Sequence, residues 1–132
     1  MSFKSIFSNC CLSIDYDKEY DCLFLSLHGQ LGFPAPQEIK QKVTNIQLVC
    51  PTSCLVQDNL AITEIGMVAA DWLATQLLPA LHQAGVERWT WVCSPTLRSQ
   101  YLAEQVARRS PRVQLTVFND LENATTWLRR LL

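Results

Sequence analysis

The sequence predicts an α/β protein with a single mixed five-stranded sheet, in the element order ββαβαβαβα. Two segments near the start, residues 12–16 and 22–27, have the apolar patterns of paired strands. The later predicted strands are separated by helix-length segments, which require crossover connections and therefore parallel pairing. A length of 132 residues with 48% hydrophobic residues suits one domain, residues 1–132, with one core.

The opening pair of strands is predicted to form a hairpin that supplies an antiparallel edge to the sheet. Before it, residues 1–10 show only a broken apolar run, so the sequence allows this segment to be loosely ordered. After it, Pro36 suits the first turn of a helix that extends to Cys50, with Ile39 and Val43 on one face.

The central strand is predicted over residues 54–58 and ends on an acid, Asp58. The following helix is expected to begin between Thr63 and Gly66 and to end near Gly85, a residue that favours the left-handed conformation after a helix. Pro79 should kink this helix because it lacks an N–H. The inward stripe is predicted to consist of Gly66, Ala69, Leu73, Leu77, Ala80 and Ala84.

The last third of the chain predicts two more strands and two helices. Residues 86–93 form a strand with Trp89, Trp91 and Cys93 on one face, and Ser94-Pro95 opens a helix. Residues 112–118 alternate as expected of a strand near an edge. Asn119-Asp120 then caps the final helix, whose inward residues are Leu121, Ala124, Leu128 and Leu131.

Composition excludes several classes of protein. The charged fraction of 17% excludes disorder, and no apolar run approaches the length of a membrane span. The N-terminus is too poor in apolar residues for a secretory signal, so we expect a cytoplasmic location and six reduced cysteines. A net charge of −1 argues against nucleic-acid binding.

Residues that could carry catalysis or bind a metal are few. Cys50 and Cys54 have only His28 and His82 as further candidate zinc ligands, without a ligand spacing. Asp58 could act as a general base, but no acid or histidine pairs with it in the sequence. Motifs for nucleophilic hydrolysis and phosphate binding are absent. We therefore expect no enzyme, no cofactor and no metal.

The order and spacing of several segments resemble the STAS-like superfamily, which includes the anti-sigma factor antagonists and small bacterial STAS and CRAL-TRIO-type proteins. The resemblance covers nearly the whole chain and implies the fold more than an activity. It depends on residues 12–17 and 23–27, Asp58, Trp72, Leu78-Pro79, Ala84-Gly85-Val86, residues 89–92 and residues 118–127.

In the antagonist branch, the resemblance implies phosphorylation of a serine or threonine at the start of the helix after the central strand. This chain departs from the Asp-Ser-Ser-Gly type of motif, because residues 59–66 contain no serine. Thr63 is the nearest hydroxyl, and a phosphate there would meet the positive end of the helix dipole. The alternative is that Thr63 only caps the helix or lies in a loop.

Apolar residues outside the inward stripe suggest a protein-interaction module. The leading hypothesis is a non-catalytic regulatory module that binds a protein partner or a second copy of itself through the loop after the central strand and the outer face of the following helix. The candidate partner surface comprises Asp58, Asn59, Thr63, Met67, Ala74, Leu78 and Leu81.

The alternative function is a small carrier or sensor of an apolar or lipid-like ligand, held between the sheet and the kinked helix. The candidate lining residues are Trp72, Pro79, Trp89 and Trp91, because a kink can open a gap and aromatic rings can line it. Core packing is the competing interpretation of the same tryptophans.

Overall fold

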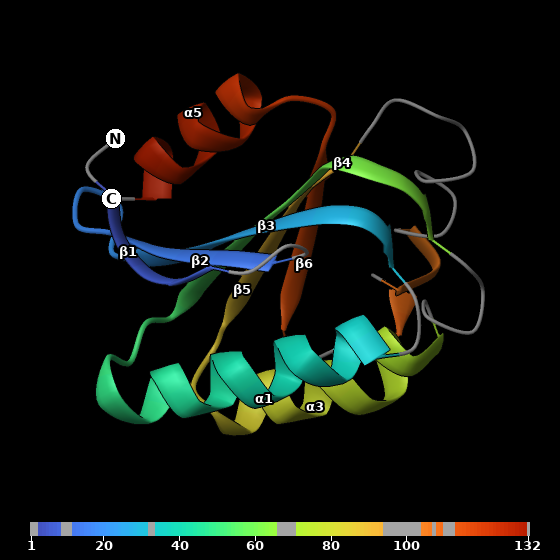
Figure 1. Ribbon diagram of the computed structural model, residues 1–132. Coiled ribbons are helices and arrows are strands. Elements are labelled where there is room, and N and C mark those ends of the chain that lie inside the picture. The colour runs from blue at the N-terminus through green and yellow to red at the C-terminus, as the bar shows by residue number, and fades with distance from the viewer. Residues whose placement is uncertain are drawn as a thin grey trace.

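The computed structural model describes residues 3–8, 12–31, 34–65, 71–93, 104–106, 108–109 and 113–131. Its strands form one six-stranded sheet, and helices cover both faces (Figure 1). The elements are β1 (Phe3–Ser8), β2 (Leu12–Asp17), β3 (Cys22–Leu31), α1 (Pro34–Val49), β4 (Cys54–Ile65), η1 (Leu73–Leu77), α3 (Leu78–Gln83), β5 (Arg88–Cys93), β6 (Gln114–Phe118) and α5 (Leu121–Leu131).

The strand order in space follows the order in sequence, from β1 to β6. The pairs β1–β2 and β2–β3 are antiparallel, whereas β3, β4, β5 and β6 pair in parallel. In Figure 1, α1 and α3 lie together on one face and α5 lies on the other. The mixed sheet agrees with the sequence prediction, and so does the β2–β3 hairpin.

The number of strands was predicted wrongly, because residues 1–10 contribute β1. This strand pairs with β2 from Phe3 opposite Asp17 to Ser8 opposite Ser13, and it forms the edge that the sequence assigned to the hairpin. Ile6 is an extra residue in the ladder, since Ser5 pairs with Asp15 and Phe7 with Ile14. Such a bulge breaks the alternation by which a strand is recognised in sequence.

The central strand β4 is longer than residues 54–58 and extends to Ile65. It continues beside β3, with Ala61 opposite His28 and Ile65 opposite Leu31. Thr63 therefore lies inside a strand, so its predicted position at a helix start is wrong. The cause is the matching extension of β3, whose residues 28–31 pair with residues 61–65 of β4.

The helix after β4 contains a π-helical turn, η1, immediately before α3. The N–H of Leu78 bonds to the carbonyl of Leu73, five residues earlier. Pro79 follows at once and has no N–H to donate, so the change in hydrogen bonding coincides with the predicted kink. Gly85 ends the helix with a φ of 96°, as predicted.

The core has two layers because helices cover both faces of the sheet. The larger layer lies beneath α1 and α3 and includes Trp89 and Trp91, both fully buried. The smaller layer lies beneath α5 and includes Phe24, Val56 and Leu128. The predicted start of a helix at Ser94-Pro95 lies outside the described residues, although residues 104–106 and 108 are helical.

The cap of α5 agrees with the sequence prediction. The Asp120 carboxylate accepts the N–H of Asn123 at 2.7 Å. Ala124 and Leu128 face the core, whereas Leu131 is 42% exposed. Among the described residues, none of the helices is both long enough and apolar enough to cross a membrane.

Candidate functional site

The outer face of the helix after β4 is not a free surface, which corrects the sequence prediction. Ala74, Leu78 and Leu81 are 5%, 4% and 0% exposed and belong to the chain's own core. They are buried because α3 packs beside α1 as well as against the sheet (Figure 1). Met67, the fourth apolar residue of that predicted surface, lies outside the described residues.

Asp58 and Asn59 are held by contacts within the sheet. An Asp58 oxygen accepts the N–H of Leu60 at 2.9 Å, and Asp58 is only partly exposed. Asn59 is 2% exposed and accepts a bond from Gln57 Nε2 at 2.9 Å. Its own amide nitrogen lies 4.0 Å from the Cys93 sulfur. Asn59 is thus part of a buried polar cluster, and Leu60, at 43%, is the exposed apolar residue beside it.

The four residues of the predicted apolar pocket occupy different environments. Trp89 and Trp91 are fully buried, with ring centroids 5.0 Å apart in an edge-to-face arrangement. Trp72 is partly buried against the same core, and Pro79 is exposed. The two strand tryptophans fill the space between sheet and helices, in agreement with the core-packing interpretation.

Two of the described cysteines, Cys22 and Cys93, have the raised pKa that is typical of buried thiols. Cys22 and Cys54 are partners on β3 and β4, and a hydrogen bond with Cys54 together with burial raises the pKa of the Cys22 thiol. Burial also raises the pKa of Cys93, to about 11. In the described part of the chain, no three His, Cys, Asp or Glu side chains cluster as metal ligands would.

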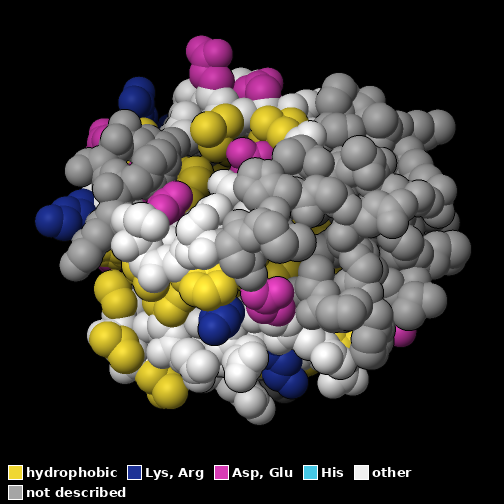
Figure 2. Space-filling view, viewed as in Figure 1, with side chains coloured by type: hydrophobic (Ala, Val, Ile, Leu, Met, Phe, Trp, Pro, Cys, Tyr) yellow, Lys and Arg dark blue, Asp and Glu magenta, His cyan; other side chains and the backbone are white. Residues whose placement is uncertain are grey.

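Among the residues whose burial the structure describes, the most exposed large apolar side chains lie at the C-terminal end of α1. Leu48 is 85% exposed and Val49 is 87% exposed, while Ile6 on β1 is 40% exposed. Figure 2 shows hydrophobic side chains gathered at the lower left, where α1 ends in Figure 1. We call Ile6, Leu48 and Val49 the apolar patch. Contiguous exposed apolar surface of this kind marks contact sites.

An apolar hollow of about 550 Å³ adjoins the patch, between the β1–β2 hairpin and α1. The backbone positions the walls of the hollow. On the β1 wall, the bulge displaces Ile6 from the ladder, and on the α1 wall, Ile46 lies one helical turn before Cys50. The residues that line it are Ser5, Ile6, Tyr16, Lys18, Asn45, Ile46, Val49 and Cys50.

One polar side chain that lines this hollow, Tyr16, is hydrogen-bonded. The Tyr16 hydroxyl donates to the Asp21 carboxylate at 2.7 Å, and this bond raises the pKa of Tyr16 to about 12. Tyr16 therefore stays neutral at ordinary pH. Lys42 lies with its ammonium 4.7 Å from the centre of the Phe7 ring and so connects α1 to β1.

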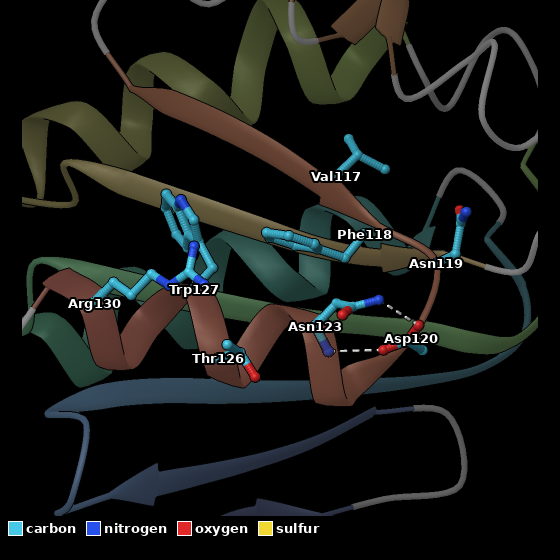
Figure 3. A pocket seen from close by; sticks show the side chains of 8 residues that line it. All are labelled: Val117, Phe118, Asn119, Asp120, Asn123, Thr126, Trp127 and Arg130. Atoms are coloured by element: carbon cyan, nitrogen blue, oxygen red, sulfur yellow. Dashed lines mark hydrogen bonds between the residues drawn. The ribbon is translucent and has the colours of Figure 1, made fainter.

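A second hollow, of about 490 Å³, lies on the opposite edge of the sheet, between β6 and α5 (Figure 3). We call it the β6–α5 groove. It is more polar than the first hollow and contains both an acid, Asp120, and a base, Arg130. Its lining residues are Val117, Phe118, Asn119, Asp120, Asn123, Thr126, Trp127 and Arg130.

Neither hollow was predicted from the sequence, although one feature of α1 pointed to the exposed apolar surface. At about 100° per residue, Leu48 lies on the opposite side of α1 from Ile39 and Val43, which face the core. An apolar residue at the position expected to be solvated was thus visible on the helical wheel. The β1 wall was hidden, because residues 1–10 were not expected to form a strand.

Comparison with solved structures identifies the fold. The chain is similar to an uncharacterised protein of the DUF3478 family with a SpoIIAA-like fold from Shewanella loihica PV-4, with a TM-score of 0.62 and 16% identity over 93% of this chain and 98% of that one. It is also similar to the anti-sigma factor antagonist SpoIIAA in its unphosphorylated form, with a TM-score of 0.59 and 12% identity over 99% of each chain.

An anti-sigma factor antagonist from Mycobacterium paratuberculosis gives a TM-score of 0.58, with 15% identity over 97% of this chain and 95% of that one. No protein-family model and no curated protein matches the sequence. The chain therefore has the STAS-like fold that the sequence predicted.

Proposed function

We propose that the chain is a non-catalytic protein-interaction module that associates with a second copy of itself through the apolar patch. The observation that carries this proposal is the exposure of Leu48 and Val49, two adjacent apolar side chains that are 85% and 87% exposed. Exposure of both side chains to water is unfavourable. Burial of one of them in a contact contributes about 1.5 kcal/mol or more to the free energy of association.

The occupant is a second copy because the patch and the hollow beside it complement one another. Val49 lines the hollow and is 87% exposed, and Ile6, Tyr16 and Ile46 line it as well. In a two-fold dimer the same surface is used twice, so each copy can insert its exposed residues into the hollow of the other.

A regulatory role is the finer part of the proposal. Two of the similar structures are described as anti-sigma factor antagonists, and the likeness to them extends over nearly the whole chain. We propose a role of the same kind here, in which a protein contact and no chemical step transmits the signal. The bond from Leu60 N–H to the Asp58 carboxylate supports a structural role for that acid.

Phosphorylation of Thr63 is not part of the proposed function. Thr63 lies within β4, which continues to Ile65, and not at a helix start. The prediction placed a phosphate at a helix N-terminus, and Thr63 does not occupy that position.

Sedimentation equilibrium of the full chain tests the proposal. We expect a concentration-dependent dimer whose dissociation constant rises about tenfold or more in Val49→Asp, because a carboxylate would have to be buried in an apolar contact. Leu131→Asp is the matched control, since Leu131 is 42% exposed on α5, which lies on the opposite face of the sheet from α1. A monomer at millimolar concentration, or equal effects of the two substitutions, would overturn the proposal.

A further inference from the structure

We propose that the β6–α5 groove binds an extended, acidic peptide segment of a partner protein, which adds as a strand to the free edge of β6. The sheet order ends at β6, and no described strand pairs with its outer side. This surface lies on the opposite edge of the sheet from the apolar patch, so the inference is independent of the proposed self-association.

The hydrogen bonds of β6 identify which backbone groups face outward. The N–H of Gln114 donates to the carbonyl of Glu87, at 2.9 Å, on the β5 side. Because backbone groups alternate along a strand, the N–H and C=O groups of Leu115 and Val117 point to the outer edge. These two residues offer two donors and two acceptors to an added strand.

The side chains of the groove provide an apolar wall beside that edge. Phe118 and Trp127 lie with ring centroids 5.8 Å apart at an interplanar angle of 52°. Figure 3 shows the Phe118 ring extending toward Trp127 between the strand and the helix. Peptide side chains that alternate toward α5 would pack on these two rings, which is how strand addition acquires specificity.

The charges of the groove favour an acidic peptide. Both Asp120 oxygens accept bonds from Asn123, from its N–H at 2.7 Å and from its side-chain nitrogen at 2.8 Å. Arg129 donates to the Tyr20 hydroxyl at 2.8 Å, whereas the exposed Arg130 has no such partner in the described residues. The unpaired guanidinium therefore complements a carboxylate on the peptide.

The geometry also fixes a spacing. Asp120 and Arg130 are ten residues apart along α5, which corresponds to about 15 Å. An extended peptide covers that distance in four to five residues. The acidic residue should therefore lie about four to five positions from the peptide residue that is beside Asp120. Figure 3 shows Arg130 and Asp120 at opposite ends of the groove.

The test uses an acetylated and amidated eight-residue peptide of alternating valine and threonine with one glutamate near one end, and a second version with lysine instead. Both are used at concentrations where the peptide alone is monomeric. We expect the glutamate peptide to slow amide hydrogen exchange at Leu115 and Val117. Arg130→Glu should reverse the preference between the peptides by about fivefold, and Arg108→Glu, which changes an exposed arginine outside the groove, should not.

A backbone variant separates strand addition from side-chain contact. Val117→Pro removes an outward N–H without removing a bond to β5, so the chain should fold and lose the peptide, whereas Val117→Thr should keep it. The inference is wrong if neither peptide protects Leu115 and Val117 at 1 mM, or if both Val117 variants bind equally. It is also wrong if Arg130→Glu and Arg108→Glu act alike.

Discussion

The two edges of the sheet differ in how they are protected. At one edge, β1 carries a bulge at Ile6, and this feature discourages pairing with another strand. At the other edge, β6 keeps a continuous register with β5 and has no charged residue or proline. The first edge therefore presents side chains for contact, whereas the second presents backbone groups.

The surroundings of each edge agree with this difference. Beside β1, the hollow is apolar and the exposed residues Leu48 and Val49 adjoin it. Beside β6, the groove has aromatic walls with an acid at one end and a base at the other. Salt should therefore weaken peptide binding at β6 more than self-association at the apolar patch.

The largest predicted effect is on stability, and it distinguishes the apolar patch from the buried face of the helix that contains Leu78. Leu78→Asp should lower the free energy of unfolding by at least about 3 kcal/mol, because Leu78 is 4% exposed and the carboxylate would be buried without a partner. Leu48→Asp should change it by less than about 0.5 kcal/mol. Urea denaturation of both variants checks this, and similar losses would contradict the assignment of the exposed surface.

An intermediate effect concerns the β6 edge in the absence of any peptide. Amide exchange at Val117 should be at least about tenfold faster than at Thr116, whose N–H faces β5 by the same alternation as Gln114. Amide-resolved exchange measured by NMR gives both rates in one experiment. Equal protection of the two amides would mean that the outer edge of β6 is already covered.

The smallest effect concerns the hollow beside β1. Tyr16 should ionise near pH 12, chiefly because its hydroxyl bonds to Asp21. The raised pKa favours the neutral phenol in the folded state, so this stabilisation is complete below pH 10 and is lost as pH rises toward 12. Asparagine tolerates the positive φ of 50° at position 21. The substitution Asp21→Asn should therefore lower the pKa of Tyr16, followed by ultraviolet absorbance, toward the ordinary value of about 10.

The titration has a clear contrary outcome. If Tyr16 ionises at the same pH in the wild type and in Asp21→Asn, the hydrogen bond from Tyr16 to Asp21 is not the cause of the raised pKa of Tyr16.

Most of the fold could be predicted because its signals are local. The hairpin of β2 and β3, the Gly85 helix end and the Asp120 cap each depend on residues close in sequence. The parallel pairing is not local, but it follows from the helix-length segments between the strands. The strand β1 could not be predicted, since pairing with β2 stabilises it and the bulge at Ile6 obscures its alternation. The extension of β4 to Ile65 depends likewise on the length of β3.

The site was harder to predict than the fold. A helical wheel assumes a constant 100° per residue, but the π-helical turn at Leu73–Leu77 changes the rotation before Leu78 and Leu81. A second helix, α1, then covers the face that the wheel left outside. Tertiary packing of this kind is not encoded in the periodicity of one segment, whereas the exposed Leu48 could have been recognised from α1 alone.

The most direct test of the central claim is an isotope-filtered NOE measurement on a mixture of labelled and unlabelled chains. Contacts are expected between the Val49 methyl groups of one copy and the Tyr16 ring of the other, because the patch inserts into the neighbouring hollow. A dimer that lacks these contacts, or one whose intermolecular contacts involve β6, would contradict self-association through the apolar patch.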